Sequence, residues 1–401
     1  MKKKYIVFGA VAFSSICGFG QQPVNYVKKK IAKSTIEIVY SQYIQNGDHS
    51  AITGGIGTEK LLVYEPEIII NKQVDSLNAY SVDVGIDVIT SASLDNIDFV
   101  MSSASRVSKR GYLRLGYERT VKQNRNLSFG GSGYFSIESA YTSLGASLSA
   151  EYTSPDKSKA FSAELESYFD DLRWGRLNGE RPLRLVYPVE LRYREWYDEY
   201  KRRSFNLNLS YQQTINEKMV IAFFPGASYQ FGLLATPYHR VYFKDSSERV
   251  ENVPDKRFKI PLGVQLNSFI GRRSVLRVYY RFYKDDFGII AHTLNTEFAM
   301  KLTPGWTLTP LLHLYTQTAA SFFKPYEQHD PSQQFYTSDY DLSAFNSYEA
   351  GIESRFAGIG KGEKGFFCNV ITLRYSYYKR SEGLHAHLIT LLMDFMNQKR
   401  K

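Results

Sequence analysis

The chain has 401 residues, 43% of them hydrophobic, and a formal net charge of +10. After its N-terminal segment it contains no run of about eighteen apolar residues, and a mean hydropathy of -0.34 is too polar for a bundle of membrane helices. Its two cysteines, Cys17 and Cys368, exclude a disulfide framework and a cysteine-based metal site once the first is removed with the leader.

The N-terminal segment has the features of a secretory signal peptide. Lysines at positions 2–4 precede an apolar run over residues 5–17 and small residues up to Gly20. This order predicts export through the general secretion pathway with cleavage near Gly20, and a short periplasmic segment over residues 21–33. Lipid attachment at Cys17 is the less favoured alternative, because Ser14-Ser15-Ile16 is a poor attachment box.

The remaining chain alternates apolar and polar residues in stretches of about ten residues, as in residues 112–119 and 205–211. One face of such a strand suits lipid, and the other suits a wet lumen. We expect sixteen strands, an even number as in bacterial single-chain barrels. They cover residues 34–45, 58–70, 80–90, 112–121, 127–137, 142–153, 160–169, 204–214, 219–230, 258–270, 274–284, 289–302, 306–318, 347–356, 366–378 and 385–396.

The connections between these strands alternate between short turns and longer loops. Short turns rich in Asn, Gly, Pro, Asp and Lys cover residues 71–79, 122–126, 154–159, 215–218, 271–273, 303–305 and 357–365. The long loops cover residues 46–57, 91–111, 170–203, 231–257 and 319–346. The sequence therefore predicts an all-β fold, an antiparallel up-and-down transmembrane β-barrel of about 16 strands over residues 34–398, with periplasmic turns and extracellular loops.

Aromatic residues and charge agree with a membrane location. The 31 tyrosines and 26 phenylalanines are typical of the aromatic girdles at both membrane interfaces, although a tyrosine-rich soluble β-sandwich is an alternative. Loss of the three leader lysines lowers the net charge from +10 to +7, spread along the chain rather than in blocks. Anionic lipid headgroups or a cation-lined lumen are therefore more natural partners than nucleic acid.

Two predicted outer loops carry oxygen-bearing side chains that suit a hard cation. Asp95, Asn96 and Asp98 lie in one loop, and Asp339 and Asp341 lie in another. Ca²⁺ takes six to eight oxygen ligands, so these five residues form a candidate calcium site. The alternative is that each Asp or Asn caps a turn by bonding its own backbone.

Other polar groups give weaker indications of chemistry. Glycines within residues 54–60 favour a tight surface loop over a nucleotide site, because no helix or Gly-Lys-Ser/Thr follows. His385 and His387 share one strand face, which favours a barrel-wall pair over a metal site. His239, in an outer loop, is a candidate proton switch. In residues 291–297 the His and the Glu fall on opposite strand faces, so no catalytic residue is nominated.

Several sequence segments spread along the mature chain resemble those of domain-of-unknown-function family 3570, a family of uncharacterised outer-membrane β-barrel proteins of Gram-negative bacteria. These segments are residues 54–61, 95–105, 234–243, 291–294, 301–304, 315–320 and 336–345. The resemblance implies an outer-membrane barrel without an assigned activity. Family members are often encoded near a small lipoprotein, a thioredoxin-like protein and a flavin transferase, which implies a lipoprotein or envelope redox partner; no flavin-attachment motif is visible here.

Three functions follow as expectations. The first is a monomeric passive channel, or a transport or export component, whose surface loops give selectivity. The second is a plugged, non-conducting barrel that docks a lipoprotein or an envelope redox partner. The third and weakest is a membrane-embedded hydrolase. No cofactor other than Ca²⁺ is expected.

Overall fold

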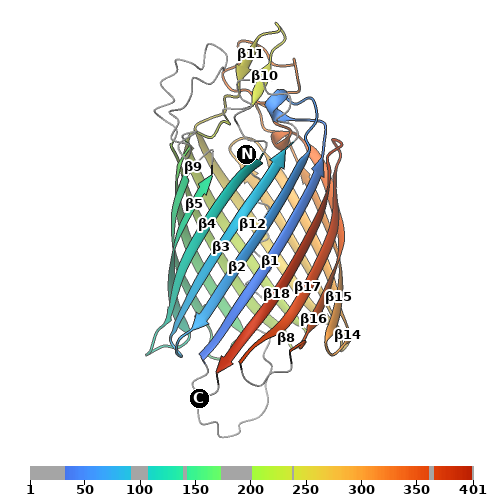
Figure 1. Ribbon diagram of the computed structural model, residues 1–401. Coiled ribbons are helices and arrows are strands. Elements are labelled where there is room, and N and C mark those ends of the chain that lie inside the picture. Colours follow the sequence, from blue (N-terminus) through green and yellow to red (C-terminus); the bar gives the residue numbers. More distant parts are fainter. Residues whose placement is uncertain are drawn as a thin grey trace.

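The computed structural model describes residues 32–91, 107–138, 142–172, 201–236, 239–360 and 365–399. Sixteen described strands form one closed antiparallel barrel, which confirms the predicted up-and-down fold (Figure 1). They are β1 Ala32–Asn46, β2 Leu61–Gln73, β3 Asn78–Ser91, β4 Val107–Thr120, β5 Leu127–Glu138, β6 Thr142–Thr153, β7 Lys159–Asp171, β8 Lys201–Asn216, β9 Met219–Gly232, β12 Lys256–Ile270, β13 Ser274–Asp285, β14 Ile290–Thr303, β15 Trp306–Gln317, β16 Phe345–Ala357, β17 Gly365–Arg380 and β18 His385–Lys399.

Each barrel strand pairs with its neighbours in the chain, and the two ends of the barrel pair with each other. β18 runs antiparallel to β1 along its whole length, from Ala32 opposite Lys399 to Asn46 opposite His385. The expected leader and most of the expected periplasmic segment lie outside the described residues, and β1 takes in the last two residues of that segment.

Some boundaries differ from the predicted ones because backbone pairing continues where apolar alternation ends. β4 begins at Val107 rather than at residue 112, and its ladder with β3 extends to the pair Thr90 and Val107. The sequence also did not predict the hairpin of β10 (Arg240–Tyr242) and β11 (Glu248–Val250). Strands of three residues are too short to show a period-two pattern.

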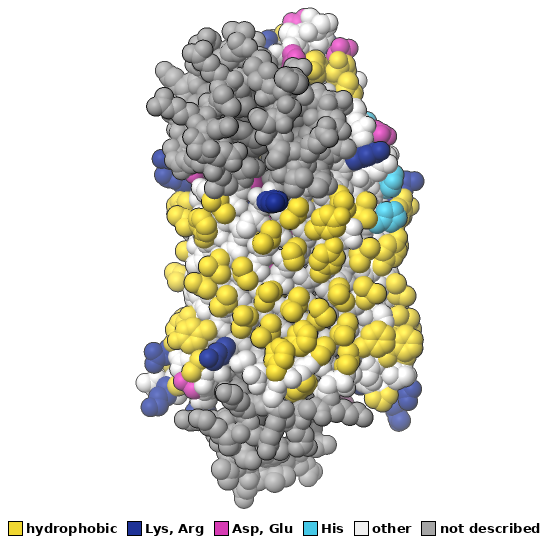
Figure 2. Space-filling model, viewed as in Figure 1, with side chains coloured by type: hydrophobic (Ala, Val, Ile, Leu, Met, Phe, Trp, Pro, Cys, Tyr) yellow, Lys and Arg dark blue, Asp and Glu magenta, His cyan; other side chains and the backbone are white. Residues whose placement is uncertain are grey.

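Side chains alternate between the two barrel faces as period-two patterning requires. On β6, Leu144 and Leu148 are 62% and 69% exposed, whereas their neighbours Ser143 and Ser147 are buried. Apolar side chains form a band across the face shown in Figure 2, and Lys and Arg side chains lie at its two edges. Exposed large hydrophobic side chains also lie on strands from β1 to β17. A closed barrel with this exterior is stable in lipid, so the protein is an outer-membrane-type barrel.

The strands are longer than a membrane crossing requires. They contain 12 to 16 residues, whereas about 9–11 residues of a tilted strand cross the hydrocarbon layer. The barrel wall therefore extends beyond that layer. Among the described residues, no helix has the length and apolar character needed to cross a membrane.

Three connections at the end opposite the tight turns pack together into a unit that we call the cap (Figure 1). It consists of residues 47–60 with the 3-10 helix η1 (Ala51–Thr53), residues 233–255 with β10 and β11, and residues 318–344 with η6 (Tyr340–Leu342). Backbone hydrogen bonds join the second and third segments, as between Asn252 and Tyr336 in both directions (3.1 and 2.8 Å).

The cap has an apolar core that reaches the inner wall of the barrel at its mouth. Its buried members are Val253, Ala320, Phe322 and Leu342 from the cap, Phe287 and Ile289 from the turn between β13 and β14, and Ala291 from β14. Tyr283 on β13 and Tyr315 on β15 pack against it from the barrel. Residues 318–344 therefore turn inward over the mouth instead of extending away from it.

Candidate functional site

The inner wall is polar, and its charges are segregated. In the closed strand order, β2–β7 lie opposite β12–β17. The alternation places acidic residues on the inner face of β2–β7, with two arginines, Arg110 and Arg114, among them. These acids are Glu65, Glu67, Asp83, Asp87, Glu118, Glu138, Glu151, Glu164, Glu166 and Asp170. Bases predominate on the facing wall, namely Arg257, Lys259, Arg277, Arg281, Lys301, Arg355, Arg374 and Arg380, beside Asp285, Glu297, Glu349 and Glu353.

Ion pairs between non-adjacent strands show that these side chains point into the barrel. Arg374 on β17 lies 2.8 Å from Glu297 on β14, and 3.0 Å from Glu353 on the neighbouring β16. On the other wall, Arg114 on β4 donates to the Tyr168 hydroxyl on β7 (3.3 Å). Such contacts span several strands only across the concave inner surface, so the lumen is lined by charged groups.

The cap is attached to the basic wall. Arg380 on β17 donates to Asp341 Oδ1 (2.9 Å) and lies over the Phe345 ring, 4.5 Å from its centroid. On β15, Gln317 Nε2 donates to the carbonyls of Asp341 (3.0 Å) and Ser343 (2.5 Å). These contacts hold residues 318–344 in place over β15–β17.

Within the cap, two segments bring one histidine and two carboxylates together. His239 precedes β10 and Glu251 follows β11, and the backbone N–H of Glu251 donates to the His239 carbonyl (3.0 Å). The hairpin therefore sets these two residues beside each other. Asp339 comes from residues 318–344, where its side chain caps η6 by accepting from the Asp341 N–H (2.8 Å).

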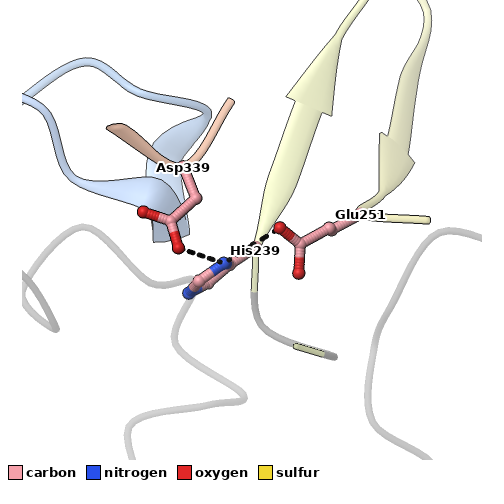
Figure 3. Close-up of side chains that lie close together, drawn as sticks. All are labelled: His239, Glu251 and Asp339. Atoms are coloured by element: carbon pink, nitrogen blue, oxygen red, sulfur yellow. Dashed lines mark ion pairs between the residues drawn. The ribbon is translucent and has the colours of Figure 1, made fainter. Parts of the chain in front are cut away.

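The three side chains converge on the histidine Nδ1 atom (Figure 3). Nδ1 of His239 lies 3.5 Å from Oε1 of Glu251 and 3.8 Å from Oδ2 of Asp339. Their side chains are 9%, 3% and 10% exposed. Nδ1 is buried and makes no hydrogen bond within the part of the chain that the structure describes. The cluster is thus a compact polar site inside the cap.

Hydrogen bonds fix the Glu251 carboxylate. Its Oε1 accepts from the Thr337 hydroxyl (2.6 Å), and its Oε2 accepts from the Thr236 N–H (2.7 Å). The same Thr337 oxygen accepts from the backbone N–H of Asp339 (3.0 Å), so Thr337 positions the Glu251 carboxylate and the backbone of Asp339. Thr337 is fully buried.

Opposing influences set the protonation of the cluster. Burial lowers the pKa of His239, but the charges of Glu251 and Asp339 outweigh it and raise this pKa above its ordinary value. For Glu251 burial raises the pKa, and His239, Thr337 and Thr236 together lower it below the usual range. Burial, and then the charge of Asp341, raise the pKa of Asp339. The cluster therefore favours the protonated form of His239 and the ionised form of Glu251.

Only part of the expected calcium site can be located. Asp339 lies in the cluster with His239, whereas the Asp341 carboxylate receives a hydrogen bond from Arg380. Asp95, Asn96 and Asp98 lie outside the described residues, so a calcium site that combines the two loops stays a prediction.

The other histidines lie where strand alternation predicts. His387 Nδ1 is 2.9 Å from the Tyr375 hydroxyl on the outer wall, and His385 lies beside Tyr377. His292 likewise contacts the Tyr280 hydroxyl (2.7 Å) on the outside, whereas Glu297 faces the lumen. The prediction that His292 and Glu297 face opposite sides is confirmed.

Sequence reasoning singled out His239 but missed its partner Glu251. A signal was present, because His239 and Glu251 stand on either side of two short alternating runs around the turn at residues 243–247. A hairpin brings such residues together. Nothing in the sequence pattern joined this hairpin to Asp339.

Comparisons with known proteins give a family without an assigned activity. The family model described as protein of unknown function (DUF3570) matches residues 11–384, and no curated protein matches. A solved "bacterial polysaccharide outer membrane secretin" is similar over 92% of this chain and 98% of its own, with 9% identity and a TM-score of 0.48. For a BenF-like porin from Pseudomonas fluorescens Pf-5 the coverages are 92% and 99%, the identity 9% and the TM-score 0.43. Pseudomonas aeruginosa OccK1 (OpdK) is similar over 91% of this chain and 99% of its own, with 8% identity and a TM-score of 0.40.

Proposed function

This chain belongs to the DUF3570 family of proteins of unknown function, and we propose from its geometry that it is an outer-membrane channel for small polar solutes. The observation that carries the proposal is the lumen, in which an acidic wall on β2–β7 faces a basic wall on β12–β17. Barrels of sixteen to eighteen strands are wide enough for an aqueous passage.

Charged walls of this kind need water or a polar solute between them. A carboxylate or guanidinium in a dry interior is strongly destabilising unless it is fully paired. A hydrated lumen removes that penalty. Two facing walls of opposite charge also produce a field across the passage, which orients dipolar or zwitterionic solutes as they pass.

The cap supplies selectivity at the outer end of this passage. It is attached to the basic wall through Gln317 and Arg380, and its apolar core reaches Tyr283 and Tyr315 at the mouth. Solutes that enter over this wall must therefore pass beside the cap. Its removal is expected to raise conductance.

Single-channel recording in planar bilayers tests the proposal. The refolded full chain is expected to give stable conductance steps, with an ion selectivity that changes when a lumenal arginine is neutralised. Arg281→Gln is the test variant, and Arg272→Gln in the tight turn after β12 is the matched control outside the lumen. Silence from protein shown to be folded and inserted, with the cap present or removed, would overturn the channel.

A second candidate function is a plugged barrel that docks a lipoprotein or an envelope redox partner. It is favoured by the apolar core at the mouth, where Phe322 of the cap packs edge-on against Phe287 in the β13–β14 turn, with ring centroids 5.0 Å apart. Replacement of residues 321–341 by a short Gly/Ser linker separates the two functions. A silent full chain whose shortened variant conducts indicates a plug, whereas conductance from both indicates a channel.

A further inference from the structure

The cap cluster of His239, Glu251 and Asp339 has the donor set of a transition-metal site. It offers one imidazole nitrogen and two carboxylate oxygens, all within 4.8 Å of one another. Zn²⁺ is bound by such nitrogen and oxygen donors, often with three protein ligands and a water molecule in the fourth position. Ca²⁺ needs six to eight oxygens, which this cluster does not offer.

The distances approach those of a formed site. Tetrahedral coordination with bonds of about 2.0–2.2 Å places ligand atoms roughly 3.3–3.6 Å apart. Nδ1 of His239 lies 3.5 Å from Glu251 Oε1 and 3.8 Å from Asp339 Oδ2. The carboxylate oxygens of Glu251 and Asp339 lie within 4.8 Å of each other, so binding an ion requires the two acids to draw closer together around it.

The buried Nδ1 atom points between the two carboxylates and makes no hydrogen bond among the described residues (Figure 3). Loss of the imidazole proton and ionisation of both acids, which metal binding requires, would leave two negative charges in the buried cluster. A divalent cation would neutralise both charges and use the lone pair on Nδ1. Thr337 already orients the Glu251 carboxylate, as outer-sphere groups do in metal sites, and it also holds the backbone of Asp339.

We propose that His239, Glu251 and Asp339 bind a divalent transition-metal ion, with Zn²⁺ as the representative ligand. The ion joins the β9–β12 connection, which carries His239 and Glu251, to the β15–β16 connection, which carries Asp339. Metal binding thereby fastens the two larger segments of the cap to each other. This inference does not depend on the barrel being a channel.

Metal titration of the refolded full chain is the direct test. Calorimetry with Zn²⁺ is expected to give one ion bound per chain, and Co²⁺ in its place should give the visible d–d bands of a tetrahedral site. Ca²⁺ titrated in the same way should give no binding at this cluster. Absence of zinc binding to folded wild-type protein overturns the proposal.

Variants locate the ion. His239→Gln and Glu251→Gln should each weaken zinc binding by about 100-fold or more, and Thr337→Val, which keeps all three ligands, by roughly 10- to 100-fold. The matched control is the double variant His385→Gln, His387→Gln, which removes an outward-facing, half-buried pair on the outer wall and should bind as wild type does.

Each outcome is decisive when folding is checked separately by heat-modifiable migration on gels. If folded Glu251→Gln binds zinc as tightly as the wild type does, the ion lies elsewhere and the site is overturned. The same conclusion follows if the double variant of His385 and His387 loses zinc binding. If His239→Gln does not insert, Thr337→Val carries the same test. Wild-type affinity in folded Thr337→Val would then contradict the proposal.

Discussion

His49 stacks on Tyr340 with ring centroids 3.8 Å apart and planes inclined by 9°. The contact joins residues 47–60, between β1 and β2, to residues 318–344, between β15 and β16. The first cap segment meets the third through this ring contact, and Gly54 lies close to the Tyr242 ring of β10. The other two segments share an apolar core and a polar cluster.

Loss of this stacking should loosen the first segment. His49→Ala is expected to cost about 1 kcal/mol locally, because a stacked ring pair contributes about that much beyond its buried area. Limited proteolysis of the cap should become roughly fivefold faster. His292→Ala, which removes a ring from the outer wall, is the control, and equal rates in the two variants would contradict the prediction.

Gly55 should not tolerate a side chain. Its φ is +89°, and an added Cβ would lie 2.7 Å from the Ser338 carbonyl oxygen. Gly55→Ala is therefore expected to cost at least roughly 1–2 kcal/mol and to release residues 47–60 from the cap. Gly133→Ala is the control, because a Cβ there meets nothing within 4 Å. Thermal melting and cap proteolysis measure the effect, and equal behaviour of the two variants would refute it.

Neutralising Arg374 should make the lumen more selective for cations. Its guanidinium lies within 3.0 Å of both Glu297 and Glu353, so Arg374→Gln leaves two carboxylates without their shared cation. The reversal potential in a salt gradient should shift toward that of a cation-selective pore. Glu297→Gln should shift it the opposite way. Shifts of the same sign would contradict the lumenal placement.

Acid should weaken the cap through His329. This ring is fully buried, its Nε2 lies 3.0 Å from the Thr337 carbonyl, and burial lowers its pKa below the usual value. In an opened cap His329 takes up a proton near pH 6.5, and in the closed cap only at lower pH. The stability that the neutral ring gives to the closed cap is therefore fully present above about pH 6.5 and is lost as the pH falls.

The measurement is cap proteolysis between about pH 7.5 and 5.5, where a histidine titrates. Cleavage should accelerate more at low pH in the wild type than in His329→Gln, which carries no titratable ring. Other titrating groups are common to both proteins and cancel in the comparison. An equal acceleration of cleavage at low pH in the two proteins would contradict the role of His329.

The orientation of the barrel can be tested on intact cells. A cleavable tag near Asp330 lies in the cap, and one near Pro155 lies in the tight turn between β6 and β7. The first should be cut by added protease, and the second should be protected. The reverse pattern would mean that the cap faces the periplasm.

The barrel could be predicted from the sequence because its determinants are local. The alternation of Ser143, Leu144, Ser147 and Leu148 marks β6 without any knowledge of its neighbours. The cap could not be predicted in this way, because its contacts are long-range. Glu251 and Thr337 are 86 positions apart, and no period relates them.

Asp341 illustrates the same limit at a single residue. In the sequence it is one of two closely spaced loop carboxylates and is a reasonable cation ligand. In the fold, Arg380, 39 positions away, already supplies it with positive charge. The residue types indicated that the loop could bind a cation. Only the packing of distant segments determines which positively charged group lies beside each carboxylate.

The pairing of β1 with β18 has a consequence for biogenesis. Ser41 and Thr390, whose hydroxyls meet across this seam, are 349 positions apart. Most other strand pairs in the barrel are close in sequence and can form as hairpins, but the seam must wait until the last strand has been made. Until then both terminal strands expose unpaired edges, which attract other chains. Delivery of the chain to the membrane therefore requires that these two edges be shielded until they find each other.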